Sequence, residues 1–158
     1  MFPLPIVEYL HLLCAFVYVA ALMAGHWNVL AARRAPTWAE RAPLFELNRR
    51  VALMFSLPAL ILTGIIGNLL AMEMGLSMGH ARPLQIVTAL WVILLALALA
   101  LDVPLAARLA TQARAAAGAN RGEPVEWDAS LGRWRLGNAL QLLVFFVLLW
   151  FMVQAWKA

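Results

Sequence analysis

The stretch LQIVTALWVILLALALALDVPL, residues 84–105, holds a single charged side chain, that of Asp102. Crossing the hydrocarbon core of a bilayer takes about 20 helical residues. An apolar segment of this length is typical of a transmembrane helix, and its lack of strict alternation argues against a strand of a membrane barrel. The stretch therefore predicts a helical membrane protein.

Three further apolar runs flank this stretch, at residues 6–30, 51–72 and 137–156. The chain of 158 residues is 65% hydrophobic and 13% charged, whereas soluble domains are about half apolar and about a quarter charged. This composition excludes an ordinary soluble enzyme, and the single cysteine, Cys14, excludes an internal disulfide. We expect an all-α fold with one domain, residues 1–158: an antiparallel bundle of four transmembrane helices, with a polar loop at 106–135. The alanine-rich start of this loop, residues 104–117, is expected to extend the third helix.

The basic residues predict how the bundle is oriented. Five arginines lie between the first two runs and five between the last two, while only Arg82 and Lys157 lie elsewhere. Because basic residues are retained in the cytoplasm, both termini are expected on the opposite side of the membrane. The net charge of +4 then reflects topology and does not indicate a nucleic-acid partner. The predominance of arginine over lysine, together with the many Ala and Leu residues, favours a bacterial source, so we expect a protein of the bacterial inner membrane. Interface anchors are expected at Trp27, Trp38, Trp127 and Trp134.

Polar side chains within the runs recur at helical spacing, and such groups usually face the interior of a bundle. The first run carries Glu8, His11, Ala15, Tyr18, Leu22 and Gly25 on one stripe. The third run carries Gln85, Thr88, Val92, Leu95, Leu99 and Asp102. The fourth run carries Asn138, Gln141, Phe145, Leu148 and Met152. In the second run, Gly64 and Gly67 are expected to permit close approach of another backbone.

With this orientation the polar residues form two layers. The outer, periplasmic layer holds Glu8, His11, Asn68, His80, Gln85 and Thr88. The inner, cytoplasmic layer holds His26, Asn28, Arg49, Arg50, Asp102, Arg135, Asn138 and Gln141. The inner layer has a structural interpretation, in which Asp102 pairs with Arg49 or Arg50 and Asn138 caps the fourth helix. It also has a functional one, an anion or proton site.

The outer layer contains two histidines at similar depth, His11 and His80. Neutral imidazole is a good ligand for iron, copper or zinc, and two such rings can bind one haem iron from both faces. The alternative is structural: His11 forms a hydrogen bond with Glu8 or Gln85, and His80 is a solvated loop residue.

Thioethers near His80 indicate a competing copper site. Met72 and Met74 form a Met-x-Met step and Met78 and His80 form a Met-x-His step, and thioether sulfur together with imidazole suits Cu(I). The structural alternative is that Met72 and Met74 complete the second helix.

Several segments resemble the HemJ-type protoporphyrinogen oxidases. They are LHLLCAFVYVAAL (residues 10–22), RRVALMFSLPALILTGIIGNLL (49–70), HARPL (80–84) and the Arg135–Asn138 pair. The first-helix pattern is also similar to that of the CopD copper-resistance proteins. The resemblance implies that His11 is a haem or metal ligand. Arg82 stands where the oxidases have lysine, which Arg does not replace in proton transfer.

Three hypotheses follow. The first is a b-type haem-binding redox protein acting on a porphyrinogen or quinone, with His11 and His80 as iron ligands. Its candidate catalytic residues are Arg82 and Glu8, and its candidate cofactor contacts are His11, His80, Asn68, Gln85, Tyr18 and Asn138. The second is a copper-handling protein. The third is a non-catalytic subunit or assembly factor of a membrane complex, and a homodimer is compatible with all three.

Overall fold

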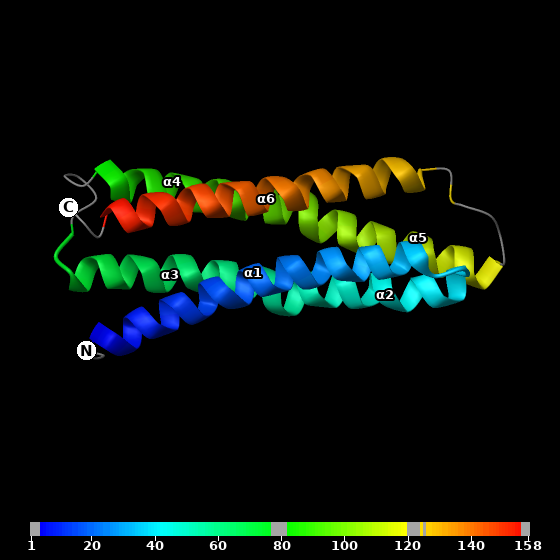
Figure 1. Ribbon diagram of the computed structural model, residues 1–158, viewed down its shortest axis with the longest axis horizontal. Coiled ribbons are helices and arrows are strands. Elements are labelled where there is room, and N and C mark those ends of the chain that lie inside the picture. The colour runs from blue at the N-terminus through cyan, green and yellow to red at the C-terminus, as the bar shows by residue number, and fades with distance from the viewer. Residues whose placement is uncertain (1–3, 77–81, 120–123, 125, 156–158) are drawn as a thin grey trace.

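The computed structural model describes residues 4–76, 82–119, 124 and 126–155. These residues form long antiparallel helical rods and no strand (Figure 1). The rods, in chain order, are α1 (Leu4–Arg34); α2 (Trp38–Val51) with η1 (Ala52–Ser56) and α3 (Leu57–Glu73); α4 (Arg82–Leu97) with η2 (Ala98–Asp102) and α5 (Val103–Ala119); and α6 (Trp127–Ala155). Each rod is long and apolar enough to cross a membrane. The expected all-α bundle of four transmembrane helices is confirmed.

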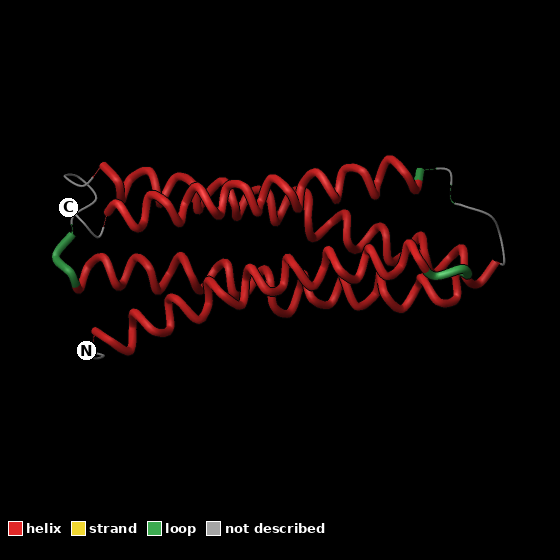
Figure 2. The backbone as a smooth tube through the Cα atoms, in the orientation of Figure 1, coloured by secondary structure: helices red, strands yellow, loops and turns green. Residues whose placement is uncertain are grey.

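The helices extend well beyond the apolar runs, as the continuous helical tube in Figure 2 shows. The expected extension of the third helix is confirmed, because α5 is rich in alanine, the best helix former, and runs to Ala119. The remaining loop is shorter than expected, since α6 already begins at Trp127. The 31 residues of α1 span about 46 Å, more than the roughly 30 Å hydrocarbon core. The excess lies at the end of the bundle that carries the two arginine-rich connections, which we call the basic end. The opposite end, with both termini, is the terminal end.

The basic end has its own apolar core. Small alanine side chains of α5 allow the helices to approach closely there, around Phe45, Trp127 and Trp134. Trp127 packs edge-on against Phe45 and Trp38, with ring centroids 4.8 Å apart in both pairs. Trp127 and Trp134 are only 4% and 1% exposed, so the expectation that they are interface anchors is wrong. Trp27, at 62% exposed, keeps that assignment.

The rods are arranged as two helix pairs. Toward the terminal end, α1 packs mainly on α3 and α4 mainly on α6, whereas α1 contacts α6, and α3 contacts α4, at few points (Figure 1). At the basic end α2 packs closely on α5 and joins the pairs. This arrangement leaves the terminal half of the bundle as the place where an internal cavity can form.

The end of α3 shapes that half of the molecule. Gly75 adopts a φ of 70°, a left-handed conformation that glycine takes without strain. Leu76 N–H then donates to Ala71 O, and Gly75 N–H donates to Met72 O, both at 3.0 Å. These two bonds are the Schellman arrangement that closes a helix. They hold Met74 and Leu76 against the bundle.

Two π-helical turns interrupt the second and third rods. Leu57 N–H donates to Ala52 O at the end of η1, and Val103 N–H donates to Ala98 O at the end of η2, each five residues back. A proline, Pro58 or Pro104, lies two residues after the last residue of each turn. Proline has no N–H and clashes with the carbonyl four residues earlier, and a wider turn relieves that clash.

Candidate functional site

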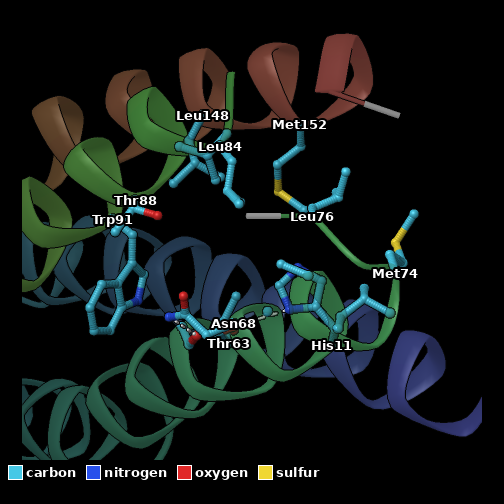
Figure 3. Close-up of a pocket in the computed structure, with 15 residues that line it drawn as sticks. His11, Thr63, Asn68, Met74, Leu76, Leu84, Thr88, Trp91, Leu148 and Met152 are labelled. Atoms are coloured by element: carbon cyan, nitrogen blue, oxygen red, sulfur yellow. Dashed lines mark hydrogen bonds between the residues drawn. The ribbon is translucent and has the colours of Figure 1, made fainter. Parts of the chain in front are cut away.

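A cavity of about 90 Å³ lies between the two helix pairs in the terminal half (Figure 3). Its walls are mostly apolar and come from α1, α3, α4 and α6, with Leu84, Val87 and Leu148 among them. Polar groups are few: the side chains of His11, Thr63, Asn68, Thr88 and Trp91 line it. An apolar cavity with a few convergent polar groups is the usual form of a small-molecule site.

His11 is the only histidine that lines this cavity within the described part of the chain, and it is 5% exposed. Its Nδ1 lies 3.0 Å from the Thr63 carbonyl oxygen, to which it can only donate. In a neutral ring the Nε2 atom then carries the lone pair. The partner is thus a backbone carbonyl on α3, not Glu8 or Gln85 as the structural alternative proposed.

Two glycines of α3 make room for side chains. A Cβ atom at Gly67 would lie 2.8 Å from His11 Cε1, and one at Gly64 would lie 2.1 Å from Trp91 Cε2. The prediction that these glycines permit close approach of another backbone is wrong, because the atoms packed against them belong to an imidazole and an indole side chain. Trp91 Nε1 donates to Leu60 O at 2.9 Å, which fixes the indole.

The cavity brings together part of the predicted outer layer. His11, Asn68 and Thr88 all line it, and Asn68 Nδ2 donates to Gly64 O at 2.9 Å. Half-buried Glu8 lies one turn before His11, and the exposed Arg82 and Gln85 lie in the first turn of α4. His80 and Met78 lie outside the described residues.

Other predicted contacts lie elsewhere in the bundle. Tyr18 donates its hydroxyl hydrogen to Gln141 Oε1 at 3.0 Å, two turns along α1 from His11. Asn138 lies in the body of α6, which begins at Trp127, so it is not the predicted helix cap. Asp102 accepts from Trp134 Nε1 at 2.9 Å. Its expected partners Arg49 and Arg50 pair instead with Glu46.

The predicted stripe of the third run is wrong in its middle. Val92 and Leu99 are 52% and 53% exposed, whereas Leu94 and Ala98 are 1% exposed. A π turn takes more residues per turn than an α turn, so η2 shifts the buried row. Asp102 therefore shares its buried face with Ala98 and Leu94. The stripes of the first and fourth runs are confirmed at His11, Tyr18, Leu22 and Gly25, and at Asn138, Gln141 and Leu148.

Sequence reasoning missed three residues of the cavity as ligands or contacts: Trp91, Met74 as a neighbour of His11, and Met152 (Figure 3). The signal for Met152 was present, because it ends the fourth stripe. Trp91 lay off the predicted stripe, which continued from Thr88 to Val92, four residues on, although Trp91 lies three residues after Thr88 on the same helix. Among the described residues, no group of three or more His, Cys, Asp or Glu side chains is placed to hold a metal ion.

The fold defines a multi-pass integral membrane protein whose four-helix bundle contains this cavity. Residues 5–155 match the model of the family described as predicted integral membrane protein (DUF2269), and the chain belongs to that family. No curated protein and no solved structure matches it. The family supports the membrane class and contact with lipid, and it assigns neither a haem-dependent nor a copper-related activity.

Proposed function

We propose that the chain is a b-type haem-binding redox protein of the bacterial inner membrane, with His11 as an axial ligand of the iron. The orientation of the His11 ring carries the proposal. Its Nδ1–H is committed to the Thr63 carbonyl, 3.0 Å away. Metal-ligating histidines almost always donate their second ring N–H in this way, which fixes the tautomer and presents the other nitrogen to the metal.

The side chains around His11 have the apolar character that a buried porphyrin requires. The walls of the cavity are largely apolar and come from both helix pairs. At about 90 Å³ the cavity is smaller than the roughly 300–1,000 Å³ typical of small-molecule sites, so the pairs must part to admit a haem. The sparse α1–α6 and α3–α4 contacts favour such a movement.

Other residues would complete the site. Met152 lines the same cavity, and its thioether would serve as the second iron ligand as an alternative to the predicted His80. A bound haem would supply one-electron chemistry. Arg82, exposed at the start of α4, would bind a carboxylate of the porphyrin or substrate, and Glu8 would exchange a proton near the membrane surface. A quinone or porphyrinogen is the electron partner that the resemblance to HemJ-type oxidases implies.

Replacing His11 tests this proposal. The detergent-purified wild-type protein should show a Soret band, sharp bands after dithionite reduction, and about one haem per chain in a pyridine haemochrome assay. His11→Ala should retain at least about tenfold less haem, because it loses a direct ligand. Added imidazole, which fits the vacated space, should restore part of the Soret band.

His26→Ala is the matched control, since His26 lies four turns along the same helix and outside the cavity. It should keep the wild-type spectrum. A His11→Ala protein with wild-type haem content refutes the assignment. If cells that carry only the His11→Ala protein behave like cells with the wild-type protein, a non-catalytic subunit of a membrane complex is favoured.

Copper binding is a second candidate, because Met74 and Met152 line the cavity together with His11 (Figure 3). Two thioethers and an imidazole are ligands suited to Cu(I). The double variant Met74→Leu/Met152→Leu conserves volume. If the site holds copper, metal analysis should show its copper content reduced at least about tenfold. Equal copper content in the variant and the wild type would exclude this site.

A further inference from the structure

A second, smaller cavity lies between the His11 cavity and the basic end. It measures about 10 Å³, the space of a single water-sized occupant. Four polar side chains line it: Asn48, Ser56, Asp102 and Asn138. Each is at most 4% exposed. These polar side chains come from α2, η1, η2 and α6, and α1 completes the lining with Ala21, Leu22 and Gly25, so the cavity draws on all four rods.

Two of these side chains have an unsatisfied polar atom. Asn48 Nδ2 and Ser56 Oγ are buried and form no hydrogen bond. An unpaired buried polar group costs about 1–3 kcal/mol, and native structures retain few of them without a bound water or ion. Both atoms belong to side chains that line the cavity, which indicates that the cavity holds an occupant.

Asp102 supplies a charge without a counter-charge. Its Oδ1 accepts one hydrogen bond, from Trp134 Nε1. None of the ion pairs among the described residues includes it, because Arg49, Arg50 and Arg114 all bind Glu46. An ionised carboxylate buried without a partner is costly, so this position favours an additional positive charge.

The two π turns meet at this cavity. η1 ends at Ser56 and η2 ends at Asp102, and each is followed by a proline two residues later. Such turns disturb the regular pairing of backbone carbonyls. In membrane proteins, interrupted helices that line a cavity commonly provide carbonyl oxygens for small cations.

We propose that this cavity binds one Na⁺ ion. Asp102 provides the single negative charge, and Ser56, Asn138 and Asn48 provide neutral oxygens, the last after a half turn of its amide. Oxygen donors select hard cations, and the absence of sulfur or imidazole from this cavity's lining disfavours transition metals. One carboxylate matches a monovalent ion. The water-sized space suits Na⁺ better than the larger K⁺.

Thermal unfolding of the full chain in detergent tests the proposal. Tm should be higher in NaCl than in choline chloride or KCl at equal ionic strength, and the gain should saturate. At ten times the Kd, the gain should reach roughly 3–6 °C. Lower pH should weaken the Na⁺ effect, because protons compete for the Asp102 carboxylate.

Substitutions locate the effect. Asp102→Asn should abolish the Na⁺ gain, and it should be at least as stable as the wild type in choline chloride, since the unpaired charge is gone. Ser56→Ala keeps the charge and should need severalfold more Na⁺ for half the gain. Asp128→Asn, at an exposed aspartate in the first turn of α6, should behave as the wild type.

Two outcomes overturn the proposal. The first is an equal Tm in NaCl, KCl and choline chloride, which would assign the cavity to water and Asp102 to a proton. The second is a Na⁺ gain that persists unchanged in Ser56→Ala and in any folded Asp102→Asn protein, which would place the ion elsewhere.

Discussion

Gly64→Ala should destabilise the bundle by about 2–4 kcal/mol, which is a fall in Tm of roughly 4–16 °C. The added Cβ would lie 2.1 Å from Trp91 Cε2 and 2.3 Å from Cζ2. The indole is rigid, and its Nε1 donates to Leu60 O on the same helix as Gly64. The clash therefore expels the indole and breaks its hydrogen bond to Leu60 O. Alanine is a better helix former than glycine by up to about 1 kcal/mol, which offsets only part of this loss of stability.

Gly132→Ala is the matched control, because a Cβ at that α6 position meets nothing within 4 Å. Thermal unfolding in detergent should show no loss, or a gain of up to about 1 kcal/mol. The double variant Gly64→Ala/Trp91→Phe should be less destabilised than the sum of its single variants, since the smaller ring relieves the clash. If the loss of stability in the double variant instead equals the sum of the losses in the two single variants, then the clash between Gly64 and Trp91 does not determine how closely α3 and α4 pack.

The four-helix bundle could be predicted from the sequence because a transmembrane helix is recognised by the length and composition of its apolar segment alone. The sequence also placed His11, Asn68 and Thr88 in one layer, since depth follows from residue count along each helix. It also predicted that the alanine-rich start of α5 extends the third helix, but it did not predict α2 or the start of α6 at Trp127. Those helices are held by alanine-based packing around Phe45 and Trp134, which hydropathy does not report.

The candidate site was harder to predict for a geometric reason. A stripe read at steps of three and four assumes an unbroken α-helix, and η2 breaks that assumption just before Pro104. The buried row therefore runs through Leu94 and Ala98, while Val92 and Leu99 face outward. Proline two residues after a buried polar side chain, as at Ser56 and Asp102, is the local signal of a shift in register in the turn before it.

Gly67→Ala should impair the His11 site while leaving the fold largely intact. The new Cβ would lie 2.8 Å from Cε1 and 3.2 Å from Nδ1 of the ring. Unlike the indole of Trp91, the imidazole can turn into the adjoining cavity, so the cost in stability is smaller. In turning, it gives up the Nδ1–H bond to Thr63 O. Loss of such an orienting bond typically costs about 10–100-fold in metal affinity, and haem retention should fall by that factor.

Two measurements separate this effect from general instability. Nitrogen NMR of histidine-labelled protein should show the His11 Nδ1–H form in the wild type and in Gly132→Ala, and its loss in Gly67→Ala, whether or not haem is bound. Tm should fall less in Gly67→Ala than in Gly64→Ala, although the two residues lie one turn apart on α3. An unchanged His11 tautomer in Gly67→Ala would mean that this glycine only packs, as Gly64 does, and that the ring is oriented by other contacts.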